Sequence, residues 1–99
     1  MICVRGDFIV HKGDKARDMF FVQRGSIEIC TEEGGKVLAT LEAPSFFGDT
    51  AILQNSLRTA SVQALTYVDM SRLSARALKD ALAAFPDDNI RVRKNEVKV

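Results

Sequence analysis

The chain has 99 residues, which is enough for about one domain and leaves no room for a second core. Its apolar fraction of 46% is that of an ordinary globular protein, and its net charge of +1 argues against a large electrostatic footprint for DNA, RNA or anionic lipid. No apolar run approaches the ~20 residues that span a bilayer, and Arg5 and Asp7 interrupt any N-terminal secretory signal. We therefore expect no nucleic-acid partner and no membrane span.

Cys3 and Cys30 each lie in an apolar, strand-like stretch. This setting favours small buried thiols over a disulfide and predicts a reducing, cytosolic environment. The chain has a single histidine, His11. Metal enzymes on a small β-roll need clustered histidine ligands, and a serine or cysteine nucleophile needs a partner base. The sequence therefore predicts neither a metal site nor an enzyme.

Residues 1–73 form a series of short β-type runs separated by glycine-containing turns. The run from Ser26 to Thr31 alternates polar and apolar residues, which is the period of a half-buried strand. Gly34-Gly35 is a hairpin signal between two such runs. The predicted strands cover 8–10, 19–22, 26–31, 37–41, 59–65 and 67–73. Several short strands at this spacing predict a sandwich, a barrel or a jelly roll.

The β pattern is interrupted once before residue 59. Pro44 and Ser45 break it, and the following segment 46–53 is too short and too mixed in polarity for a core helix. Its apolar residues Ala51, Ile52 and Leu53 also disfavour an open loop. We therefore expect a single helical turn near 48–53.

A longer helix is predicted directly after Ser74, whose hydroxyl can accept a hydrogen bond from a first-turn amide. Leu78, Leu82 and Phe85 lie at helical spacing and form one apolar stripe. Pro86 ends the helix, because proline lacks an amide hydrogen and restricts the residue before it. The charged tail beyond Pro86 matches neither the helical period nor the strand period.

Three residues between the two β blocks together suggest an anion site. Gly48 and Asp49 open the short helical turn, and Arg58 follows nine residues after Asp49. The start of a helix exposes unpartnered amides, glycine permits close approach, and the planar fork of arginine matches a phosphate bidentately. A carboxylate beside this site would repel a free phosphate, but it can accept hydrogen bonds from a neighbouring sugar hydroxyl.

This segment resembles a known family. Gly48-Asp49-Thr50-Ala51-Ile52-Leu53, followed by Arg58-Thr59-Ala60-Ser61-Val62, is similar to the phosphate-binding cassette of cyclic nucleotide-binding domains. The family pattern is roughly Phe-Gly-Glu, two small residues, Leu, a short loop, and then Arg-Thr/Ser/Ala-Ala-x-Val. The resemblance covers nearly the whole chain: 6–9 with 12–14 match the opening strands, and 19–29 match the central hairpin.

The resemblance implies a role for each cassette residue. Arg58 would bind the exocyclic oxygens of the cyclic phosphate, and backbone amides of Gly48 and around Thr59 and Ala60 would complete that cradle. Asp49 would bind the ribose 2′-hydroxyl, at a position that the family usually gives to the longer glutamate. Thr59 resembles a threonine that contacts guanine in members that respond to cGMP. The candidate ligand-binding residues are Phe47, Gly48, Asp49, Thr50, Ala51, Arg58, Thr59 and Ala60.

The resemblance also implies the architecture. It predicts a mainly β fold, an eight-stranded antiparallel β-roll of the jelly-roll kind, with a one-turn helix in the cassette and a C-terminal helix. Residues 1–99 would be one cyclic nucleotide-binding domain excerpted from a larger protein, without the N-terminal helices of the family and without part of its lid helix. Segments 66–69 and 85–87 are most similar to the channel branch of the family.

The implied function is regulatory. The domain would bind cAMP or cGMP and relay binding to an attached effector, with a cation channel favoured, on the cytosolic face of a membrane protein that assembles as a homo-oligomer. No cofactor other than this nucleotide ligand is expected. Two alternatives stay open: a structural homologue of the same fold that no longer binds nucleotide, and the sensor domain of a kinase regulatory subunit or a transcription regulator.

Overall fold

The computed structural model describes residues 1–32 and 34–84 of the chain. Eight strands and two helices lie in this part of the chain. In chain order they are β1 (Ile2–Cys3), β2 (Phe8–Val10), β3 (Asp18–Arg24), β4 (Ser26–Cys30), β5 (Val37–Glu42), β6 (Ser45–Phe47), α1 (Asp49–Leu53), β7 (Ser61–Ala64), β8 (Val68–Ser74) and α2 (Ala75–Ala84).

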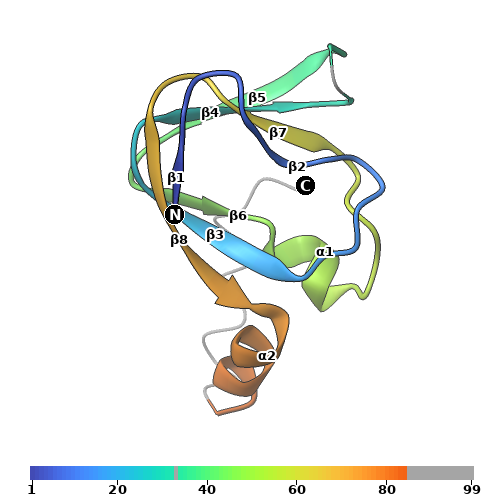
Figure 1. Cartoon of the computed structure of the whole chain (residues 1–99). Helices are drawn as coiled ribbons and strands as arrows, with labels where there is room; N and C mark the ends of the chain where they lie inside the picture. The colour runs from blue at the N-terminus through green and yellow to red at the C-terminus, as the bar shows by residue number, and fades with distance from the viewer. Residues whose placement is uncertain (33, 85–99) are drawn as a thin grey trace.

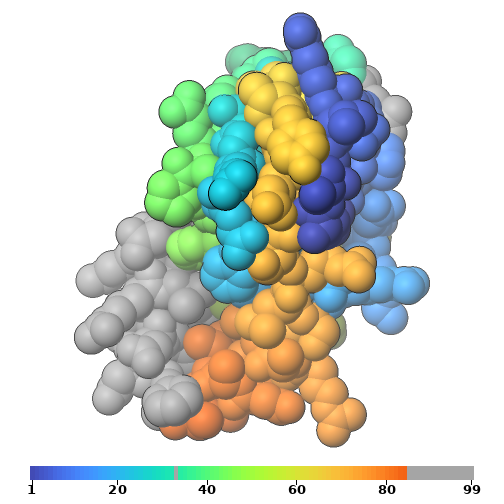
Figure 2. Space-filling view, turned by 60° about the vertical axis from the view of Figure 1, so that its left-hand side comes forward, coloured from blue at the N-terminus to red at the C-terminus, as the bar shows by residue number. Residues whose placement is uncertain are grey.

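The strands form two four-stranded antiparallel sheets, with the orders β1-β8-β3-β6 and β2-β7-β4-β5. The sheets face each other, and both helices lie toward one end of the roll (Figure 1). β1 lies alongside β8 on the surface shown in Figure 2. The predicted eight-stranded β-roll is therefore confirmed. No described helix is long and apolar enough to cross a bilayer.

The alternating pattern in the sequence explains the core between the sheets. Ile27 and Ile29, two positions apart on β4, are both fully buried, as the two-residue period of a strand requires. Val62 on β7 and Val68 on β8 are buried as completely. Each such side chain contributes roughly 1.5–3 kcal/mol by leaving water.

The structure shows two of the glycine-containing turns clearly. β4 and β5 pair from Ser26 opposite Glu42 to Cys30 opposite Val37, so the hairpin predicted around Gly34-Gly35 is confirmed. At Gly25, φ is +94°, and a Cβ atom would lie 2.2 Å from the carbonyl oxygen of Tyr67. Only glycine fits between β3 and β4, because the backbone of Tyr67, just before β8, lies against this position.

A second apolar cluster attaches the helices to the roll. Ile52 of α1 and Met19 of β3 pack against Leu78 and Leu82 of α2. The Ser74 hydroxyl accepts a hydrogen bond from the amide of Ala77 at 3.1 Å, which confirms the predicted N-cap. The apolar stripe at 78 and 82 is confirmed as well, whereas Phe85, Pro86 and the tail lie outside the described residues.

The strand predictions were wrong at two places. Ser45 was expected to belong to a break, and Phe46 and Phe47 to lead into the helical turn. The three residues instead form the short strand β6 beside β3. The strand predicted from residue 59 begins only at Ser61, because residues 57–60 form a bridge and a bend.

Neither Cys3 nor Cys30 forms a disulfide, and both are buried, as the sequence predicted. The Cys30 thiol donates to the carbonyl oxygen of Ser61 at 3.6 Å. Burial raises the pKa of the Cys3 thiol, with a further contribution from the Asp7 carboxylate. Cys3 is therefore held as a neutral thiol and is a poor nucleophile.

Candidate functional site

β6 and α1 place the first half of the predicted cassette. Phe47, fully buried, stacks on Phe20 of β3 with ring centroids 5.1 Å apart. The chain then turns at Gly48, where φ is +94°, and α1 begins at Asp49. Asp49 is fully buried, and Thr50 and Ala51 are 8% and 2% exposed. The single helical turn predicted at 48–53 is thus confirmed.

Backbone hydrogen bonds place the second half. The amide of Arg58 donates to the carbonyl oxygen of Asp14 at 2.8 Å, and the amide of Gly13 donates to the carbonyl oxygen of Arg58 at the same distance. The neighbouring Lys15 and Leu57 form an isolated bridge. The turn between β2 and β3 therefore holds Arg58, although the residues are more than forty positions apart.

The side chain of Arg58 crosses from this turn to the start of α1. Its Nη1 donates to the carbonyl oxygen of Gly48 at 2.5 Å, and its Nη2 donates to the carbonyl oxygen of Asp18. The residue is only 3% exposed, and its Nε has no hydrogen-bond partner among the described residues. A buried guanidinium thus joins the cassette to β3 and keeps donors in reserve, since it carries five N–H groups.

The electrostatic setting of Arg58 combines burial with three neighbouring carboxylates. Burial lowers the pKa of the guanidinium, and the carboxylates of Asp18, Asp14 and Asp49 partly offset that effect. Arginine nevertheless remains charged in proteins. A cation that has been removed from water is stabilised by an anion that replaces its lost interactions with water.

The predicted site residues differ in contact and in burial. Gly48 and Arg58 are in direct contact. Thr59 is exposed, whereas Ala60 is buried at 1% exposure, and both lie in the bend before β7. The cassette motif predicts that the side chain of Arg58 faces a pocket and does not contribute to the stability of the fold. In the structure it also binds two backbone carbonyl groups.

Arg58 lines a cavity of about 200 Å³ whose rim carries residues that the sequence reasoning missed. Lys15 and Arg17 add positive charge there, and Asp14 and Asp18 add carboxylates. The sequence indicated this neighbourhood only through residues 12–14, which resemble part of the family's opening strands. Among the described residues, no cluster of three or more histidine, cysteine or acidic side chains could hold a metal ion.

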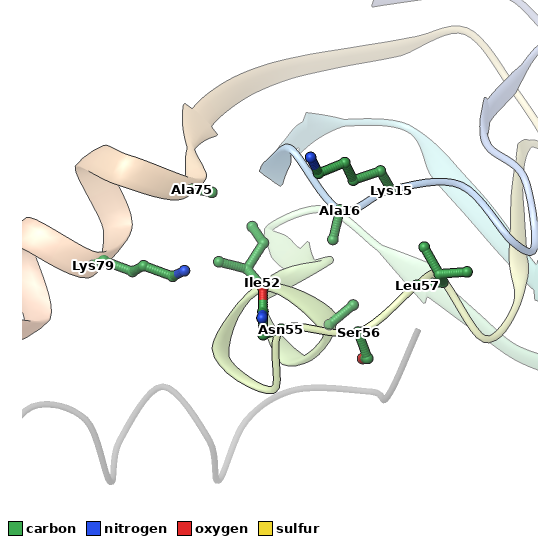
Figure 3. Close-up of a pocket in the computed structure, with 9 residues that line it drawn as sticks. Lys15, Ala16, Ile52, Asn55, Ser56, Leu57, Ala75 and Lys79 are labelled. Atoms are coloured by element: carbon green, nitrogen blue, oxygen red, sulfur yellow. The ribbon is translucent and has the colours of Figure 1, made fainter.

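Ala51 lines a different cavity, of about 310 Å³, between α1 and α2. Its lining is mostly apolar, and Lys15 and Lys79 contribute the charged side chains. Figure 3 shows the Lys79 side chain extending toward Ile52 across this space. This cavity lies on the side of α1 that faces α2, although Ala51 and Ile52 are themselves only 2% exposed.

Comparison with known proteins identifies relatives over most of the chain. The family model for the cyclic nucleotide-binding domain matches residues 3–85. A cyclic nucleotide-gated channel of Caenorhabditis elegans is 40% identical over 88 residues, which is 83% of this chain and 12% of the channel. A cyclic nucleotide-gated cation channel protein of Drosophila melanogaster is 38% identical over the same length, 83% of this chain and 13% of that protein. The chain thus spans about an eighth of the length of these relatives.

Solved structures share the fold at lower identity. The regulatory subunit of a cAMP-independent protein kinase A from Trypanosoma brucei superposes with a TM-score of 0.82 at 22% identity, covering 95% of this chain and 34% of that one. A cAMP-bound EAL enzyme gives a TM-score of 0.77 at 22% identity, covering 84% and 23% of the two chains. With the family match over residues 3–85, these findings show that the chain belongs to the cyclic nucleotide-binding domain family.

Proposed function

We propose that this domain binds cAMP or cGMP at the cassette around Arg58 and transmits binding to an effector in the same protein. The observation that carries the proposal is the Arg58 guanidinium, buried at 3% exposure and hydrogen-bonded to Gly48 at the start of α1. A cyclic phosphate is the monoanion that such a group can bind through a planar pair of donors.

Arg58 retains donors for this ligand. Its Nη1 and Nη2 each carry two hydrogens, and the Gly48 and Asp18 carbonyls accept from them. The unpartnered Nε–H and a remaining terminal N–H form one edge of the guanidinium. That edge is the geometry in which arginine binds phosphate bidentately.

The other cassette residues complete the proposed site. Backbone amides of Gly48, Thr59 and Ala60 contribute further donors to the phosphate. Asp49 accepts from the ribose 2′-hydroxyl, while Phe47, Thr50 and Ala51, the buried neighbours of Gly48 and Asp49, hold the cassette backbone beside the nucleotide. We assign cAMP as the slightly preferred ligand, with cGMP binding as well.

Packing between the helices offers a route for the signal. Ile52 lies on α1, three residues after Asp49, and packs against Leu78 and Leu82 of α2. A shift of α1 on nucleotide binding would therefore move α2. We propose this contact as the link between the cassette and whatever follows the domain.

The relatives suggest the effector. Both are described as cyclic nucleotide-gated channels, and we propose an ion channel of homo-oligomeric type, with this domain on its cytosolic side. A kinase regulatory subunit or a transcription regulator remains the second setting, since the Trypanosoma brucei regulatory subunit shares the fold. Sequencing the complete parent gene distinguishes them, because a channel adds transmembrane helices and a transcription regulator adds a DNA-binding domain.

A second candidate function is a domain that keeps the fold but does not bind these nucleotides. Two observations favour it: Asp49 stands where the family usually has glutamate, and the matching regulatory subunit from Trypanosoma brucei is described as cAMP-independent. The buried, charged Arg58 argues for retention of binding.

Titration calorimetry with cAMP and cGMP tests the proposal directly. We expect both to bind the wild type, and Arg58→Ala to weaken binding at least tenfold, because hydrogen bonds to a charged group contribute about 1.5–3 kcal/mol. Arg76→Ala, an exposed arginine on α2, is the matched control and should bind like the wild type. Absence of heat and of thermal stabilisation with both nucleotides would establish the second candidate instead.

A further inference from the structure

The hydroxyl group of Thr50 is buried without a hydrogen-bond partner among the described residues. The side chain is 8% exposed, so bulk water does not satisfy it. Buried polar side-chain atoms in native proteins nearly always have a partner, and an exception calls for a specific explanation. An unfilled ligand site is such an explanation.

The position of Thr50 ties it to the cassette. It is the second residue of α1 and follows Gly48 by two positions, and the Gly48 carbonyl oxygen accepts from Arg58. Successive helical residues differ by about 100°, so Thr50 lies about 200° around α1 from Ile52. Ile52 packs against α2. The Thr50 side chain therefore leaves α1 on a different side from the α2 contact.

We propose that the Thr50 hydroxyl donates a hydrogen bond to the cyclic phosphate of the bound nucleotide, beside the charged donors of Arg58. The inference rests on the proposed function, because the nucleotide supplies the acceptor. A hydroxyl that is unsatisfied in the free domain has already lost its hydrogen bonds to water, so a bond formed in the complex stabilises the complex without a further desolvation cost for that hydroxyl.

Removal of the hydroxyl tests this role. Thr50→Val keeps the shape of the side chain, and we expect it to bind cAMP about tenfold more weakly than the wild type. Thr50→Ser, which keeps the hydroxyl, should retain most of the affinity. Without nucleotide, the denaturation midpoint of Thr50→Val should equal or exceed that of the wild type, because no protein bond is lost.

Ser45 provides a matched control. Its hydroxyl is also buried without a partner among the described residues, but it belongs to β6 and lines a shallow groove with Phe21 and Phe46. Ser45→Ala should therefore leave the affinity for cAMP unchanged. A loss of affinity in Ser45→Ala as large as that in Thr50→Val would overturn the specific role of Thr50.

Four further outcomes would overturn the proposal. Wild-type affinity in Thr50→Val removes the contact, and a lower denaturation midpoint without nucleotide means that the hydroxyl has a structural partner. With 2′-deoxy-cAMP, the loss in Thr50→Val should persist; if it disappears, the hydroxyl binds the ribose and not the phosphate. A wild type that binds no nucleotide refutes the proposed function together with this inference, whereas normal wild-type binding with an unaffected Thr50→Val refutes this inference alone.

Discussion

Arg58 donates from Nη1 to the carbonyl oxygen of Gly48 at 2.5 Å, across ten positions of sequence. The same guanidinium also binds the carbonyl oxygen of Asp18, forty positions away. One side chain therefore joins the start of α1 to the start of β3. The residue proposed to bind the phosphate also holds two segments of the roll together, so ligand binding and local structure are coupled at this point.

Replacement of Arg58 should lower stability as well as affinity. Arg58→Ala leaves the buried carbonyl oxygens of Gly48 and Asp18 without their donors, and an unsatisfied buried group costs about 1–3 kcal/mol. Arg58→Lys should recover part of the stability but little of the affinity, because an ammonium group lacks the planar fork. Urea denaturation without nucleotide measures the first effect, and calorimetry on the folded variants measures the second. Unchanged urea midpoints would contradict the structural role.

Gly48 should tolerate alanine poorly, for two separable reasons. Its φ of +94° disfavours any residue with a Cβ atom, and that atom would lie 3.0 Å from Nη1 of Arg58. Gly6 has the same φ, but a Cβ atom there would meet nothing within 4 Å. Gly6→Ala should cost roughly 1–2 kcal/mol of strain, and Gly48→Ala should cost more and weaken cAMP binding. Equal stability losses in the two variants would show that the Arg58 contact is unimportant.

Asp49→Glu should tighten nucleotide binding. Aspartate is one methylene shorter than the glutamate usual in the family, so the longer side chain should reach the ribose hydroxyl more directly. Asp49 is fully buried, however. An added methylene in a packed site costs about 1–3 kcal/mol, so the free domain should be less stable. Calorimetry with cAMP and 2′-deoxy-cAMP checks the first effect: the gain should vanish with the deoxy ligand.

The sequence predicted the fold well because its signals were local. Alternation in β4, the paired glycines at 34–35 and the capping hydroxyl of Ser74 each act within a few residues, and each was confirmed. β6 was missed because Pro44 directly precedes it and only three residues pair, with their partner strand lying more than twenty positions earlier. Such pairing depends on tertiary contact, which a local pattern does not contain.

The sequence predicted those parts of the site that depend on the identity of a side chain, and it missed the parts that depend on backbone groups. The motif indicated Gly48 and Arg58, and the structure brings them into contact. The role of Asp18 could not be predicted, because it acts through its backbone carbonyl group and any residue type has one. The bend that exposes Thr59 was missed for a similar reason: backbone bonds from Arg58 to residues 13 and 14 delay the start of β7.

Ser74→Ala should selectively weaken α2. The Ser74 hydroxyl accepts from the Ala77 amide at 3.1 Å, and loss of an N-cap costs about 1 kcal/mol. For a domain of this size, that cost lowers Tm by roughly 4–8 °C if the unfolding is cooperative. Ser71→Ala is the matched control, since Ser71 is an exposed serine on the same strand, and its Tm should stay near that of the wild type. Hydrogen exchange should also accelerate at the amide of Ala77 in Ser74→Ala.

Because Leu78 and Leu82 pack against Ile52 of α1, a weakened α2 should also reduce the stabilisation by cAMP. An unchanged Tm together with unchanged exchange at Ala77 would show that the cap contributes nothing and that α2 is held by its apolar face alone.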